Sequence, residues 1–139
     1  MARFNFRLQR VLDYRAGLEE EAKRAYQAAH AATGAEEREI RAVQQRRLGL
    51  LSLETRNLDE RQAVEQCVLS LDQSLRHHHT ILDQLRFEEE KALARWVEAR
   101  RSLLSIEKLR DKAWEAWQLE ETRREQRAMD EFAVLRRAA

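Results

Sequence analysis

Proline is absent from this 139-residue chain, and glycine occurs only at positions 17, 34 and 49. Sheet folds of this length need tight turns, which draw mainly on glycine, proline, asparagine and aspartate. The chain is instead rich in alanine, glutamate, arginine, leucine and glutamine, which lose little conformational freedom in a helix. With 37% charged and 6% aromatic residues, it also lacks the apolar surface for a thick, layered core. We therefore expect long helices that pair as a coiled coil.

The second half of the sequence carries an apolar series with steps that alternate between four and three residues. A sustained series of this kind is typical of a helix that packs against another helix. Three of its members, His78, Glu89 and Arg110, are polar, and we expect looser packing there. The full series is Leu71, Leu75, His78, Leu82, Leu85, Glu89, Ala92, Trp96, Ala99, Leu103, Ile106, Arg110, Ala113 and Trp117.

The first half carries a related series, which we predict to be interrupted between Ala32 and Ile40. The step between these two residues is eight rather than seven, which predicts a stutter that locally unwinds the supercoil. The series is Leu8, Val11, Arg15, Leu18, Ala22, Ala25, Ala29 and Ala32, followed by Ile40, Val43, Arg47 and Leu50.

Residues 53–62 separate the two series and contain the best turn residues available. Asn57 can end one helix in a left-handed conformation, and Asp59 can cap the next helix. We therefore predict an all-α fold, a two-helix antiparallel coiled-coil hairpin with unequal arms, as a single domain 1–139. The predicted bounds are about 5–56 for the first helix, about 57–59 for the turn and about 60–136 for the second helix.

A bend at this position determines which residues of the two helices face each other. Ala22 falls opposite the neighbourhood of Trp96, so that a small residue faces a large one in the same layer. The second helix is longer than the first, and roughly 115–139 has no partner within the chain. Its apolar residues predict a surface for another chain. They are Trp117, Leu119, Met129, Phe132 and Leu135.

No group of side chains predicts catalysis or a bound cofactor. Carboxylates on paired helices face water, and nothing predicts the concave pocket that an enzyme needs. His77, His78 and His79 point in different directions on a helix, whereas metal-binding pairs stand four residues apart, so we expect no metal. His78 is either a tolerated polar layer or part of a partner-binding row. Cys67 is the single cysteine, which excludes an internal disulfide.

Charge is spread unevenly along the chain, although the formal net charge is only +1. Residues 1–15 sum to +3 and residues 123–139 to +2, so the rest of the chain carries −4. A hairpin brings these two ends together, which predicts an open end that meets an acidic surface. No apolar run is long enough to span a bilayer, and 1–15 does not resemble a signal peptide. We therefore expect a cytoplasmic protein.

Both ends of the sequence resemble one family. The start is FNFRLQRVLDYR at 4–15, followed by an acidic run at 19–21, and is similar to the start of FliJ, a small component of the bacterial flagellar export machinery. The end contains EKL at 107–109 and REQRAMDEFA at 124–133, which resemble the closing signature of that family. Arg127 stands where the family usually has lysine, and the positive charge is kept.

The resemblance implies a non-enzymatic hairpin similar to the central stalk of rotary ATPases. It implies an open end inserted in the hexameric export ATPase FliI, whose assembly the protein promotes, a contact with the export gate FlhA, and recycling of export chaperones. Such a protein serves flagellum biogenesis and thereby chemotaxis, and associates peripherally with the cytoplasmic face of the inner membrane. We expect a monomer that binds no nucleic acid and does not itself enter the membrane. The expected ATPase contacts are Phe4, Arg7, Leu8, Arg10, Val11, Asp130, Glu131 and Phe132, and the expected gate contacts are Leu71, Leu75 and His78.

Two other interpretations are compatible with the sequence. A generic helical scaffold, either a self-associating coiled coil or the homologous rod of a virulence-type secretion system, would show the same apolar series. A nucleic-acid binder would use the arginine-rich ends and would show steeply salt-dependent DNA binding, but the aromatic stacking platforms expected for single strands are absent.

Overall fold

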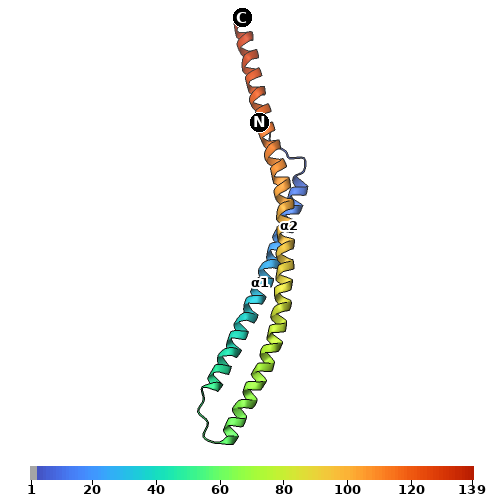
Figure 1. Ribbon diagram of the computed structural model, residues 1–139. Coiled ribbons are helices and arrows are strands. Elements are labelled where there is room, and N and C mark those ends of the chain that lie inside the picture. The colour runs from blue at the N-terminus through green and yellow to red at the C-terminus, as the bar shows by residue number, and fades with distance from the viewer. Residues whose placement is uncertain (1–2) are drawn as a thin grey trace. The chain divides into compact units, whose positions relative to one another are not determined.

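The computed structural model describes residues 3–139 and contains two helices, α1 (Gln9–Leu51) and α2 (Leu58–Ala138). They are 43 and 81 residues long. They pack against each other as an all-α hairpin (Figure 1), which confirms the predicted fold class and the unequal arms. The chain divides into two compact units. The end unit comprises Met1–Glu20 with Val97–Ala139, and the tip unit comprises Glu21–Trp96. That the whole chain is a single coiled-coil domain stays a prediction.

The segment before α1 is extended rather than helical, so α1 begins later than predicted, at Gln9 instead of about residue 5. The amide of Gln9 donates to the carbonyl of Phe6 at 3.1 Å and closes the turn that starts the helix. The extended backbone lets the two preceding aromatic side chains reach α2. Phe6 is 9% exposed and packs with Leu12 and Ile106, and the Phe4 ring lies 5.9 Å from the ring of Trp117. Burial of these rings explains the later start.

The turn between the helices lies at residues 52–57 and not at about 57–59 as predicted. The hydroxyl of Ser52 donates to the carbonyls of Leu48 and Gly49, at 2.8 and 3.1 Å, and satisfies the end of α1. Asn57 does not adopt a left-handed conformation: none of the described residues has a positive φ. Its side-chain oxygen instead accepts from the amide of Glu60 at 2.9 Å. Asn57 therefore caps the start of α2, the role that the sequence analysis gives to Asp59.

The buried face of α1 follows a heptad series without interruption, so the predicted stutter is wrong. Val11 and Leu18, which the predicted series includes, are 37% and 41% exposed, and Ala25 and Ala32 are exposed as well. The observed series keeps strictly alternating steps of four and three. Its members are all buried or half-buried: Leu8, Leu12, Arg15, Glu19, Ala22, Tyr26, Ala29, Thr33, Glu36, Ile40, Val43, Arg47 and Leu50.

The predicted series of α2 agrees much better with the burial pattern. Every member from Leu71 to Trp117 is buried or half-buried except Arg110, which is exposed. The series also extends back toward the turn through the half-buried Val64 and Val68. In the tip unit, α2 therefore presents its predicted face to α1.

The pairing of the two helices in the tip unit stays close to the predicted one, although the ring partner of Trp96 lies one helical turn beyond Ala22. Trp96 stacks on Tyr26, with 5.5 Å between ring centroids and 24° between ring planes, whereas the sequence analysis places Ala22 opposite it. The other cross-helix pairs, His30 with Glu89, Glu36 with His78 and Arg47 with Asp72, all lie within one helical turn of the predicted pairing.

Candidate partner-binding site

The end unit has a small apolar core close to the N-terminal segment. Phe6, Leu12 and Ile106 form it. Phe4, Leu8, Leu103 and Ala113 pack around it. In addition, Arg15 Nη1 donates to the carbonyl of Ser102 at 2.9 Å. These contacts hold the start of the chain against α2.

The predicted ATPase contacts divide into two groups in the structure. Near the start of the chain, Phe4 and Leu8 are half-buried and serve the end-unit core, while Arg7, Arg10 and Val11 are exposed. Near the end, Asp130, Glu131 and Phe132 are exposed, and Phe132 is 66% exposed. No hydrogen bond, ion pair or ring contact found among the described residues joins the two groups. The structure thus offers two separate exposed surfaces within the end unit.

The last part of α2 extends past the N-terminal segment (Figure 1). Every residue from 122 to 139 is exposed, so none of these side chains has a substantial packing partner in the chain. We call 115–138 the overhang. Its large apolar side chains are Leu119, Met129, Phe132, Val134 and Leu135, at 54 to 72% exposed. All of them except Val134 are among the residues predicted from the sequence.

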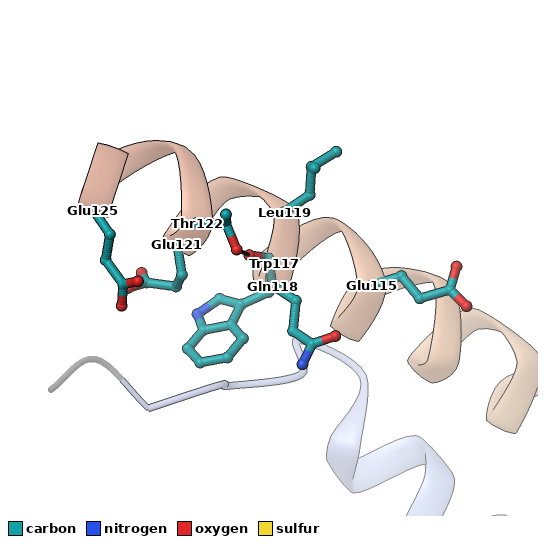
Figure 2. A pocket seen from close by; sticks show the side chains of 7 residues that line it. All are labelled: Glu115, Trp117, Gln118, Leu119, Glu121, Thr122 and Glu125. Atoms are coloured by element: carbon teal, nitrogen blue, oxygen red, sulfur yellow. Dashed lines mark hydrogen bonds between the residues drawn. The ribbon is translucent and has the colours of Figure 1, made fainter. Parts of the chain in front are cut away.

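The overhang carries a groove at its beginning and a second one near its end. Figure 2 shows the first, in which Trp117, Glu121 and Glu125 point to one side of α2 and Leu119 to the other. The second is mainly apolar and has one arginine. The first groove is lined by Glu115, Trp117, Gln118, Leu119, Glu121, Thr122 and Glu125. The second is lined by Ala128, Met129, Phe132, Ala133 and Arg136.

The predicted gate contacts lie on the face of α2 that packs against α1. Leu71, Leu75 and His78 are all half-buried. Nδ1 of His78 lies 2.5 Å from Oε1 of Glu36, so this histidine forms a polar layer between the helices. Leu71 in addition lines an open groove at the tip. The other residues of that groove are Arg46, Gly49, Leu50, Cys67 and Ser70.

The tip exposes several leucines that are not among the residues predicted to bind a partner. Leu48, Leu51 and Leu69 are 62%, 55% and 63% exposed. Leu51 and Leu69 line a second groove together with Val64 and Val68. Each of these three leucines directly follows a member of the heptad series of its helix. Leucines beside a series, rather than in it, are the signal that identifies such a surface.

Polar side chains in the tip unit are paired across the helices. Arg47 Nε donates to Asp72 at 2.7 Å, and Nδ1 of His30 lies 2.7 Å from Oε1 of Glu89. The hydrogen bond with His30, followed by one with Thr33, lowers the pKa of Glu89 below its ordinary value. These pairs give Arg47 and Glu89, two polar members of the heptad series, a partner on the other helix. No group of three or more histidine, cysteine or acidic side chains in the described part of the chain is placed to hold a metal ion.

These features define a class of protein: a two-helix coiled-coil hairpin with exposed apolar and charged surfaces at its tip and along one unpaired helix end. A family model described as "Flagellar FliJ protein" matches residues 4–138, so the chain belongs to the FliJ family, as its two ends indicate. The protein is therefore associated with flagellar protein export, in a family of non-catalytic components. No curated protein and no solved structure matches the chain significantly. Across the residues that the structure describes, no helix is long and apolar enough to cross a bilayer.

Proposed function

We propose that this protein is the non-enzymatic stalk of the flagellar export ATPase. The end unit binds the hexameric ATPase FliI and promotes its assembly, and the tip binds the export gate FlhA. Export chaperones are further partners, and the protein associates with the cytoplasmic face of the inner membrane through these contacts. The observation that carries the proposal is family membership over residues 4–138, together with the exposed apolar side chains that the overhang carries from Leu119 to Leu135.

For the ATPase, we propose that the contact is made by the exposed residues among those predicted near the start and near the end of the chain. Arg7 and Arg10 supply positive charge beside the N-terminal segment, and Phe132 supplies apolar surface on the overhang. Phe4 and Leu8 contribute indirectly, because they hold the N-terminal segment on α2. Val11, Asp130 and Glu131 complete the proposed surface.

Stimulation of FliI ATPase activity tests this contact. The double variant Arg7→Glu/Arg10→Glu should lose stimulation and co-purification with FliI at low salt, because it reverses charge without touching the core. Arg38→Glu/Arg41→Glu is the matched control, since it changes two exposed arginines of the tip unit. If the wild-type protein neither stimulates FliI nor co-purifies with it, the stalk assignment is wrong. If Arg7→Glu/Arg10→Glu binds FliI with full affinity, the electrostatic part of the proposed contact is wrong.

For the gate, we propose a contact that centres on the tip groove containing Leu71 and extends toward Leu75 and His78. Substitution of these half-buried residues would also disturb the pairing of the helices, so exposed neighbours give the sharper test. Leu69→Asp should weaken binding to the cytoplasmic part of FlhA. Leu109→Asp, at an exposed leucine of the end unit, should leave it unchanged. Equal binding by both variants would contradict a contact at the tip.

A further inference from the structure

Seven of the residues that line the two grooves of the overhang fall on one heptad face of α2. Positions 115, 118, 122, 125, 129, 132 and 136 line them, with steps that alternate between three and four residues. This spacing is that of a coiled-coil seam. It is a different face from the one that packs on α1, whose series passes through Trp117. The overhang thus carries a second heptad face that has no partner within the chain.

The two halves of this face are complementary to each other. The first half is acidic: residues 115–125 hold Glu115, Glu120, Glu121 and Glu125 against two arginines, a net −2. The second half presents Met129 and Phe132, and residues 126–137 sum to +1. On the face itself, Glu115 stands at one end and Met129, Phe132 and Arg136 at the other, so that the face fits a second copy of itself in the antiparallel direction.

Among the described residues of the overhang, the ion pairs leave several carboxylates and arginines without an ion-pair partner. Glu120 pairs with Arg127 at 3.9 Å and Glu121 with Arg124 at 3.2 Å. In the described part of the chain, Glu115 and Glu125 make no ion pair, and neither do Arg136 and Arg137. In an antiparallel pair of overhangs, Glu115 of each chain faces the Arg136 region of the other.

We propose that the free protein forms a reversible antiparallel dimer through residues 115–138 of α2, with Phe132 of each chain in the groove beside Trp117 of the other. The contact is isologous, so two chains complete it and no open assembly results. Polar members at Thr122 and Glu125 make the seam weak, which keeps the dimer dissociable. The monomer expected from the sequence is then the form that binds partners. The dimer buries the same apolar surface when no partner covers it.

Sedimentation equilibrium of the full-length protein over a wide range of concentrations tests the proposal. The wild type should pass from monomer to dimer as concentration rises. Phe132→Asp should raise the dissociation constant at least about tenfold, because it removes the most apolar side chain of the seam. Phe87→Asp is the control, since Phe87 is similarly exposed, at 53%, but lies in the tip unit. A wild type that stays monomeric throughout, or an equal effect of both variants, would overturn the dimer.

Charge exchange tests the antiparallel direction. Glu115→Arg and Arg136→Glu should each weaken the dimer, because each places like charges opposite one another. The double variant Glu115→Arg/Arg136→Glu should restore the wild-type dissociation constant. A double variant that is as weak as either single variant overturns the antiparallel pairing. This experiment contains no FliI, so its result is independent of the proposed ATPase contact.

Discussion

Glu36 and His78 meet between the two helices of the tip unit, with 2.5 Å between Oε1 and Nδ1, and their side chains are only 15% and 20% exposed. Each belongs to the heptad series of its helix. A paired polar layer of this kind fixes the register of a coiled coil at some expense of stability.

Replacing His78 alone should destabilise the protein, because Glu36 would remain half-buried beside an apolar side chain. We expect His78→Leu to lower the free energy of unfolding by about 1 kcal/mol, measured by urea denaturation. Glu36→Leu/His78→Leu should recover this loss, since it replaces the polar layer by an apolar one. His79→Leu, at the exposed neighbouring position, is the control and should change stability by no more than a few tenths of a kcal/mol. A double variant as unstable as the single one would show that the pair is not coupled.

Glu89 should make the stability of the tip unit depend on pH. Its pKa is lowered from 4.5, chiefly by the hydrogen bond with His30. A carboxyl group whose pKa is lower in the folded state stabilises the protein at pH values above its pKa in the unfolded state. This contribution disappears as the pH falls through its pKa in the folded state. The melting temperature of the wild type should exceed that of Glu89→Gln at neutral pH. The difference should vanish in acid, well below 4.5.

The control for this pH dependence is Glu90→Gln, which changes the adjacent, exposed carboxylate. It should follow the wild type at every pH. Removal of the partner by His30→Ala should reproduce the behaviour of Glu89→Gln. A difference between wild type and Glu89→Gln that persists unchanged into acid would contradict the assigned cause.

Asn57 should be the most sensitive residue of the turn. Its side chain accepts the amide of Glu60, and the Glu60 carboxylate accepts the amide of Arg56 at 2.8 Å. Asn57→Ala should cost about 1 kcal/mol of stability, whereas Asn57→Asp, which retains an acceptor, should cost much less. Asp59→Ala discriminates between the two candidate caps, because it would be the damaging change if Asp59 capped α2 as first predicted. Chemical denaturation measures all three variants.

The sequence predicts α2 better than α1, for a physical reason. Most positions of the α2 series are leucine, isoleucine, tryptophan or alanine, so apolar spacing locates the buried face. In α1 the buried face includes Glu19, Thr33 and Glu36, which the predicted series omits, while the apolar Val11 and Leu18 lie beside it. A search for apolar residues therefore finds most of the series but selects Val11 and Leu18 wrongly, and it misses these polar members, which are identified only through their partners.

The candidate surfaces show a related limit. The sequence identifies the overhang, because its apolar residues lie beyond the length that the first helix can cover. It does not identify the extended segment before α1, whose geometry depends on the contacts of Phe4 and Phe6 with α2. The heptad series does separate Leu69 from Leu71, because Leu71 belongs to the series and is half-buried, whereas Leu69 stands beside it and is exposed.

Gly17 offers a simple route to a more stable protein. It lies within α1, does not adopt a positive φ, and an added Cβ would meet nothing within 4 Å. Alanine at this position would reduce the freedom of the unfolded chain and introduce no clash. Gly17→Ala should therefore raise the free energy of unfolding by about 0.5–1 kcal/mol. Thermal and urea denaturation would both show the gain.

The reverse change at an exposed alanine of the same helix provides the control for Gly17→Ala. Ala31→Gly should lower stability by a similar amount, about 0.5–1 kcal/mol, and the two changes combined should nearly cancel. Gly34→Ala should behave like Gly17→Ala, because its Cβ would meet only Nη1 of Arg38 at an ordinary 3.6 Å. If Gly17→Ala instead lowered the stability, the added Cβ would have to clash in solution with an atom that is not part of this chain's fold. Because this position belongs to the end unit, occupation by a second chain would then appear as a concentration-dependent effect of the substitution.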